Sequence, residues 1–176
     1  MSLTSPIKPY DPTWPQQYAA EEARLRPIFG STLIGIHHVG STAVPELAAK
    51  GEIDVLAVVT SDTELENWSR SLVGLGYRRG GDLSSGHHFF KRDVNGVRTH
   101  KLHVCMDGHE QIARMLKFRD HLRKDAGSRL RYHELKLRLE RENTSGIQQY
   151  LRAKENWPRL FGQRPAGFKW IPAGLC

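Results

Sequence analysis

The sequence predicts a fold of the α/β (α+β) class, in which a mixed sheet with flanking helices is followed by a C-terminal helical cap. Three observations predict it: the apolar run Ile53–Val59, the Asn95-Gly96 dipeptide between two strand-like runs, and helical periodicity after Gly108. A continuous β-branched run suits a strand that is covered on both faces. Asn-Gly between two such runs is the strongest short-range signal of a β-hairpin.

The remaining elements follow from local patterns. Proline-rich residues 1–15 predict an extended arm, and the Gly/Ser-rich stretch 80–86 predicts a surface loop. Strands are predicted over 33–39, 53–59, 88–94 and 97–106. Helices are predicted over 16–29 (interrupted at Pro27), 62–75 (with Asp62 as N-cap), 110–124, 128–142 and 146–159.

Composition restricts the class of protein. Hydrophobic residues make up 39% of the 176 residues and charged residues 26%, which is typical of a folded domain and not of a disordered chain. Two cysteines, Cys105 and Cys176, exclude a disulfide framework and favour a reducing, cytoplasmic location. No apolar run approaches the roughly 18–20 residues of a membrane span, and residues 1–11 do not resemble a signal peptide, so no membrane partner is expected.

Charge divides the chain into two parts. The net charge is +7, and the excess lies in residues 108–176, where 15 Lys and Arg face 7 Asp and Glu. We therefore expect an α/β core over 1–107 and a basic helical cap over 108–176, packed together as one unit. Such asymmetry suggests an anionic partner, although a solvated basic surface explains it equally well.

A glycine-serine turn precedes the buried strand. Gly40-Ser41-Thr42 ends one strand, and Asp54 lies near the start of the next. Glycine allows a ligand to approach the backbone, and the following N–H and hydroxyl groups can bind phosphate. A carboxylate in an apolar strand must be paired, bound to metal or at the open end of the strand. An ordinary turn is the alternative. The second carboxylate that a two-metal site needs, two residues beyond Asp54, is replaced by Leu56.

Two histidines are candidates for the same site. Strand alternation puts the side chains of Lys101, His103 and Cys105 on the same face of their strand. If this strand neighbours the Asp54 strand, His103 could face Asp54 and act as a general base, a metal ligand or a hydrogen-bond donor to phosphate. His38 adjoins the turn. A buried, hydrogen-bonded histidine is the alternative in both cases, and no histidine has the spacing of a zinc site.

Each C-terminal helix carries a cation on or beside its apolar stripe. These cations are Arg119, Lys136 and Lys154, and the last two repeat the spacing Tyr-x-x-x-Lys. Buried cations need anionic partners, so the three could converge on a polyphosphate. They could instead extend to solvent or pair with Asp120 and Glu134.

Taken together, these motifs resemble the GrpB family of bacterial proteins. The resemblance runs from about Ile7 to Phe161 and rests on the order and spacing of several segments. They are residues 10–15, 36–45, 47–50, 53–55, 102–104 and 118–123, with Tyr132-x-x-Leu135-Lys136 and Tyr150-x-x-x-Lys154. Three positions depart from the pattern: His37 replaces a frequent Glu, Gly51 a frequent Pro, and Leu56 the second acid of the wider superfamily.

The resemblance implies a nucleotidyltransferase-like fold, whose members transfer a nucleoside monophosphate from a nucleoside triphosphate with Mg²⁺ held by strand carboxylates. It makes Gly40 and Ser41 the phosphate-binding turn and Asp54 the metal ligand. Thr42 and Lys50, in the same motif, are further candidate phosphate contacts. The third acid would fall near His103, which is not an acid. Similar domains fused to dephospho-coenzyme A kinase suggest a nucleotide or coenzyme context.

Three functions remain open. The first is a nucleotidyl transfer to a small acceptor, with Mg²⁺ on Asp54 and His103 as base. The second is a non-catalytic nucleotide-binding or regulatory module, which the missing carboxylate at Leu56 favours. The third is RNA binding by the basic helices, which ranks last because no aromatic-rich basic strand is present to stack bases. The sequence does not define the oligomeric state.

Overall fold

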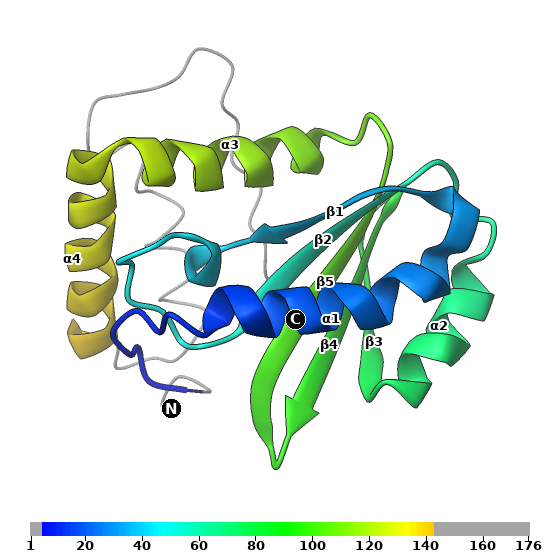
Figure 1. Ribbon diagram of the computed structural model, residues 1–176, viewed down its shortest axis with the longest axis horizontal. Coiled ribbons are helices and arrows are strands. Elements are labelled where there is room, and N and C mark those ends of the chain that lie inside the picture. Colours follow the sequence, from blue (N-terminus) through cyan, green and yellow to red (C-terminus); the bar gives the residue numbers. More distant parts are fainter. Residues whose placement is uncertain (1–4, 143–176) are drawn as a thin grey trace.

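A computed structural model describes residues 5–142 of the chain and contains one five-stranded sheet in the order β1-β2-β5-β4-β3 (Figure 1). The strands are β1 Leu33–Val39, β2 Ile53–Val59, β3 Tyr77–Ser84, β4 His87–Val94 and β5 Val97–Met106. The α-helices are α1 Trp14–Phe29, α2 Leu65–Gly74, α3 Glu110–Lys124 and α4 Ala126–Glu142. Two 3₁₀ helices, Gly30–Thr32 and Ser41–Ala43, flank β1.

The sheet is mixed, as the sequence predicts. β2 and β5 run parallel, and the other three pairs are antiparallel. Every residue of β2 except Asp54 is buried. This explains why its sequence is continuously apolar rather than alternating, since both of its faces are covered.

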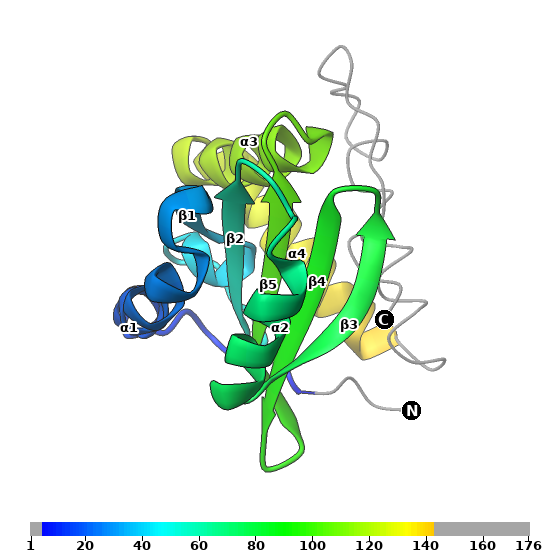
Figure 2. The same cartoon turned by 90° about the vertical axis from the view of Figure 1, so that its right-hand side faces the viewer.

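The helices cover both faces of the sheet. α1 and α2 pack on the face formed by Val55, Ala57, Leu102 and Val104. α3 packs on the opposite face, where Ile112, Met115 and Leu116 cover Leu56, Val58 and Cys105. In Figure 2, α2 lies in front of the sheet and α4 behind it. α4 joins α3 to the segment after β1 through a separate cluster, formed by Val44, Leu47, Leu122, Tyr132 and Leu135.

The predicted hairpin is confirmed. β4 and β5 pair antiparallel around Asn95-Gly96, and both turn residues have positive φ, +52° and +77°. This is the conformation that a two-residue type I′ turn requires, and asparagine and glycine adopt it most readily.

Three local predictions are wrong. Residues 80–86 are largely not a loop, because β3 extends to Ser84 as an edge strand, with the Phe89 ring packed over Gly80, where a Cβ would lie 2.6 Å from the ring. Asp62 does not cap α2, since its carboxylate binds His88 and the helix begins at Leu65. α1 is not interrupted, because Pro27 lies in its last turn, where the lost hydrogen bond does not stop a helix that ends at Phe29.

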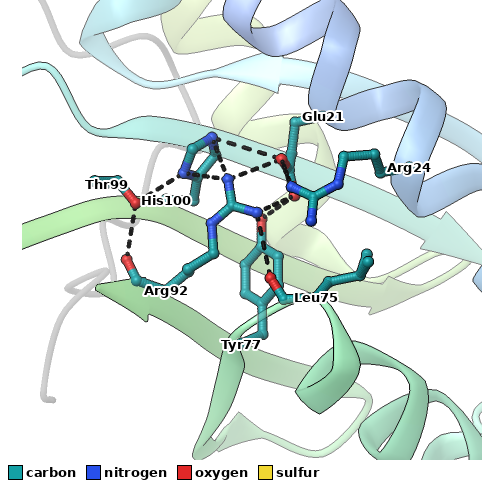
Figure 3. Close-up of polar contacts among 7 residues, drawn as sticks. All are labelled: Glu21, Arg24, Leu75, Tyr77, Arg92, Thr99 and His100. Atoms are coloured by element: carbon teal, nitrogen blue, oxygen red, sulfur yellow. Dashed lines mark hydrogen bonds and ion pairs between the residues drawn. The ribbon is translucent and has the colours of Figure 1, made fainter. Parts of the chain in front are cut away.

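A buried ion network fixes α1 to the sheet (Figure 3). The Glu21 carboxylate of α1 accepts hydrogen bonds from the Arg92 guanidinium of β4, the shorter at 2.8 Å, and from the Tyr77 hydroxyl at 3.0 Å. Arg92 also contacts the His100 ring on β5. Glu21 is only 3% exposed, so these partners replace the hydrogen bonds that water would give its carboxylate.

Glu21→Gln is expected to lower the free energy of unfolding by about 3 kcal/mol, because it leaves the nearly buried Arg92 without its carboxylate. Urea denaturation followed by tryptophan fluorescence measures the change. Glu66→Gln is the matched control, since Glu66 is 83% exposed and contacts Arg79 at 3.5 Å, and should cost less than about 1 kcal/mol. Equal losses in the two variants would contradict the structural role of the network.

Candidate functional site

The end of β1 and the start of β2 bring Gly40 against Asp54. The strands pair Val39 with Asp54, and Gly40 has a φ of +73°. A Cβ on Gly40 would lie 2.2 Å from Oδ2 of Asp54, so only glycine fits this position. The predicted proximity of the turn and the carboxylate is therefore present.

Thr42 links the turn to the adjacent segments. Its hydroxyl donates a hydrogen bond to the Glu52 carbonyl at 3.1 Å and lies 3.0 Å from Nε2 of His38. Because the hydroxyl proton goes to Glu52, the ring nitrogen of His38 must donate. Burial, with smaller effects from Arg123 and Arg119, lowers the pKa of His38 to about 4, so the ring is neutral at pH 7. Thr42 and His38 thus hold the turn in shape.

Lys101 of β5 lies beside Asp54. The strand register pairs the two residues, and Nζ of Lys101 is 4.0 Å from Oδ1 of Asp54 and 2.5 Å from Oε2 of Glu52. Burial opposes the charge on Lys101, but Asp54 and Glu52 outweigh it and raise the pKa of Lys101. For Glu52, burial is likewise outweighed by Lys101, so the pKa of the Glu52 carboxyl is lowered. The site therefore contains two carboxylates and one ammonium group.

Two arginines of α3 bind the backbone on either side of the turn. Arg119 donates to the His38 carbonyl at 3.1 Å, and Arg123 donates to the Ala43 carbonyl at 2.8 Å. Arg119 also contacts Asp120 at 2.8 Å, the alternative partner that its sequence neighbourhood suggested. Both guanidinium groups give the turn a positive electrostatic environment.

α4 contributes Tyr132 and Lys136 to the same region. The Tyr132 hydroxyl forms a side-chain hydrogen bond with Ser41, and burial together with the Asp54 charge raises the pKa of Tyr132 above its ordinary value. One turn later, Lys136 is 2% exposed, contacts the Ala48 carbonyl and lies 5.1 Å from the Tyr132 ring centroid. Lys136 therefore points inward and does not extend to solvent.

His103 occupies a different place from the one predicted. Its register partner on β2 is Leu56, and Lys101 has the position opposite Asp54. The correction follows from the parallel pairing of β2 and β5, which local alternation cannot define. His103 is 5% exposed, its Nδ1 lies 2.9 Å from Nε2 of His87, and burial holds its pKa well below the ordinary value. It is the buried, hydrogen-bonded histidine of the alternative interpretation.

Two further lysines, Lys50 and Lys154, were predicted to contact phosphate. Lys50 is half-buried and precedes Gly51, and its charge is among those that lower the pKa of Glu52. Lys154 lies outside the described residues.

Several residues of the site were not predicted from the sequence. Arg123 and Tyr132 lie in segments that carry the family resemblance, but their contacts with the turn depend on how α3 and α4 pack. A glutamate at the entry to a strand is usually solvated, but Glu52 is only 5% exposed. Alternation along β5 did place Lys101 on the face of His103, and only the register was needed to select it.

The donor set fits a single magnesium ion better than a pair. Asp54, whose side chain is 22% exposed, provides one carboxylate, and Mg²⁺ commonly uses one or two carboxylates with substrate phosphates and water. A metal pair needs further carboxylates, but the position two residues beyond Asp54 is the fully buried Leu56, and the position opposite is Lys101.

Comparison with known sequences gives a consistent family match. Residues 5–164 match the model of the family described as GrpB protein. The chain is 34% identical over 149 residues to the UPF0157 protein YqkA of Bacillus subtilis, covering 84% of this chain and 43% of YqkA. It is 37% identical over 148 residues to the UPF0157 protein BH1888 of Halalkalibacterium halodurans, covering 84% and 75%. A dephospho-CoA kinase of Mycolicibacterium paratuberculosis is 28% identical over 178 residues, covering 87% of this chain and 44% of the kinase.

Solved structures support the fold. The crystal structure of the conserved protein GrpB from Enterococcus faecalis superposes with a TM-score of 0.78 at 26% identity, covering 90% of this chain and all of that one. The Cid1 poly(U) polymerase, in a structure bound to MgATP, gives a TM-score of 0.56 at 14% identity, covering 84% of this chain and 50% of Cid1. The second likeness concerns the nucleotidyltransferase-like fold alone.

Within residues 5–142, no helix has the length and apolar character that crossing a membrane requires.

Proposed function

This chain belongs to the GrpB family, and from that premise we propose that it binds a nucleoside triphosphate, or a related phosphorylated small molecule, at the Gly40–Ser41 turn. The phosphates would contact the turn, with Asp54 beside them and the cations of β5, α3 and α4 around them. The proposal includes the cytoplasmic location that the sequence favours, with which the free, buried Cys105 is consistent.

The contact between Gly40 and Asp54 is the observation that carries the proposal. A side chain on Gly40 would collide with the Asp54 carboxylate, so a glycine at this position is what allows the backbone to lie this close to Asp54. Backbone N–H groups near a glycine of positive φ can form an anion-binding concavity. Arg119 and Arg123 bind carbonyls on either side of this turn, which adds positive charge where a phosphate would bind.

Magnesium is part of the proposal. Asp54 would hold one Mg²⁺ together with the phosphates of the ligand, and the ion would neutralise part of their negative charge. Lys50 and Lys136 are proposed to neutralise the remainder, as point charges that suit phosphate. Lys154 is proposed for the same role.

Binding is better supported than nucleotidyl transfer. Leu56 and Lys101 occupy positions where a metal pair would need carboxylates, and His103 is buried against His87 rather than opposite Asp54. A base must reach the hydroxyl of the acceptor, and the described contacts of His103 do not favour that role. We therefore propose a nucleotide-binding or regulatory module, with transfer to a small acceptor as the second candidate because Asp54 remains beside the turn.

Asp54→Asn is expected to weaken magnesium-dependent nucleotide binding at least tenfold, because it removes the carboxylate but keeps the shape of the side chain. Calorimetric titration of the full chain with ATP, GTP, CTP and UTP, with and without Mg²⁺ or Mn²⁺, measures the affinity. Melting temperature provides a second readout, since ligand at 100 times its Kd stabilises the native state by about 2.7 kcal/mol.

Glu66→Gln removes an equivalent charge from the exposed side of α2 and should bind as the unmodified chain does. Pyrophosphate release, measured in parallel, separates the two functions: binding without release supports the module, and release that Asp54→Asn abolishes supports transfer. Failure of all four nucleotides to bind would refute nucleotide binding, and equal binding by Asp54→Asn would refute the site.

A further inference from the structure

A second group of potential ligands lies at the other end of β5, on the face that α3 covers. Within residues 5–142, donor atoms of His87, Cys105 and His109 all lie within 4.8 Å of one another. They come from three elements: β4, β5 and the N-cap of α3. The strand register pairs His87 directly with Cys105. The group is four residues along β5 from Lys101, so it does not belong to the Asp54 site.

The chemistry of this group is that of a metal site. One thiol and two imidazoles are ligands that zinc prefers, in tetrahedral geometry with bonds of about 2.0–2.3 Å. Such bonds would require the three donors to approach one another by roughly 1 Å. His87 and Cys105 are buried, whereas His109 is partly exposed and provides a route for an ion from solvent.

His103 forms a hydrogen bond with His87 and so can fix the orientation of the His87 ring. Its Nδ1 lies 2.9 Å from Nε2 of His87, and burial keeps both rings neutral, with the pKa of His87 at about 4. If His87 donates this hydrogen bond, its other nitrogen carries the lone pair that a metal needs. A hydrogen bond on the second nitrogen of a metal-bound histidine is the usual means of fixing the ring.

His109 has local contacts that an ion would replace. Its Nδ1 accepts the Gln111 N–H at 3.1 Å, and its Nε2 lies 3.0 Å from Oγ of Ser84. An N-cap bond contributes little to stability in comparison with the bonds of a structural zinc ion, so an ion can replace it. These contacts hold the ring near Cys105 and do not prevent binding.

We propose that His87, Cys105 and His109 form a zinc site that ties the start of α3 to β4 and β5, with water in the fourth position. The Cys105 thiol loses one proton to solvent as the sulfur–zinc bond forms. The histidines bind as neutral imidazoles. Burial alone raises the pKa of the Cys105 thiol to about 12, so without an ion the sulfur stays protonated.

Cobalt(II) titration of the full, reduced, metal-free chain tests the proposal, because cobalt occupies zinc sites and reports sulfur ligation by absorbance. One ion should bind per chain, with release of one proton and a thiolate-to-cobalt charge-transfer band in the near ultraviolet. Zinc should then displace the cobalt. None of these readouts depends on nucleotide binding at Asp54.

Variants assign the ligands. Cys105→Ser should abolish the charge-transfer band and weaken zinc binding at least a hundredfold, and His109→Ala, at a partly exposed position, should weaken it at least tenfold. His121→Ala, at an exposed position of α3, should bind zinc as the unmodified chain does. His103→Leu removes the acceptor for the His87 N–H and should weaken zinc binding ten- to a hundredfold, as loss of a supporting hydrogen bond does elsewhere.

Circular dichroism and urea denaturation establish that each variant is folded. The proposal is overturned if the unmodified chain binds neither ion at micromolar concentration, if cobalt binds without the charge-transfer band, or if folded Cys105→Ser binds zinc as tightly as the unmodified chain.

Discussion

Acidification from pH 7.5 to pH 5 is expected to lower the free energy of unfolding by several kcal/mol. Burial lowers the pKa of His38, His87 and His100 to about 4, and it holds the pKa of His103 well below the ordinary value. In the unfolded chain each imidazole binds a proton below about pH 6.5. The unfolded state therefore binds more protons between about pH 6.5 and 4, and stability falls as the pH falls through this window.

The size of the effect follows from the number of histidines. One pKa unit corresponds to about 1.4 kcal/mol, so four neutral buried rings together make an appreciable part of the 5–15 kcal/mol that stabilises a typical domain. Urea denaturation at pH 7.5, 6 and 5, in the presence of a chelator, measures it. His38→Gln keeps a donor to Thr42 and should reduce the pH dependence. Equal stability at pH 7.5 and pH 5 would contradict the assignment of these rings as neutral.

Gly40→Ala is expected to abolish nucleotide binding, with a loss of at least a hundredfold in affinity, and to destabilise the fold. The new methyl group would lie 2.2 Å from Oδ2 of Asp54 at a backbone φ of +73°, so either the turn or the carboxylate must move. The unfavourable φ alone costs about 1–3 kcal/mol. Calorimetric titration and urea denaturation measure the two effects separately.

Gly96→Ala is the matched control for Gly40→Ala. Gly96 has a φ of +77°, but nothing lies within 4 Å of a Cβ at that position. This variant should lose stability through backbone strain and keep its affinity for nucleotide. Combining Gly40→Ala with Asp54→Ala should recover part of the lost stability, because the second change removes the colliding carboxylate. A Gly40→Ala variant that binds nucleotide normally would show that the turn is not the phosphate site.

The fold could be predicted where local signals and tertiary structure agree. The β-branched run of β2 and the Asn95-Gly96 turn define the strands without reference to anything distant. β3 was missed because its glycines indicate a loop by local propensity. The Phe89 ring of the next strand occupies the space that a Cβ on Gly80 would need, and no local pattern reveals this packing.

The candidate site could be predicted only in outline. Asp54 and the turn are separated by one short connection, so their proximity follows from adjacent antiparallel strands. The choice between Lys101 and His103 opposite Asp54 depends on the register of a parallel pair joined by β3, β4 and α2. The group of His87, Cys105 and His109 likewise gave no signal, because its members come from three elements and share no zinc-ligand spacing.

Lys101 places a fixed positive charge beside the two carboxylates of the site. Where a metal pair would need a carboxylate, the chain places an ammonium group 2.5 Å from Glu52 and 4.0 Å from Asp54. A fixed cation can neutralise carboxylates or phosphate at all times, whereas a metal ion must be bound from solution. This arrangement agrees with a protein that binds a phosphorylated ligand without the two-metal chemistry.

Titration of the isotopically labelled chain with Mg²⁺-ATP, followed by NMR of the backbone amides, tests the central claim most directly. The account predicts that the amides of Gly40 and Ser41 shift most, that Asp54→Asn reduces these shifts, and that Glu66→Gln leaves them as they are. Saturable shifts confined to residues far from the turn, for example on the outer surface of α4, would contradict it, as would no saturable shifts at all.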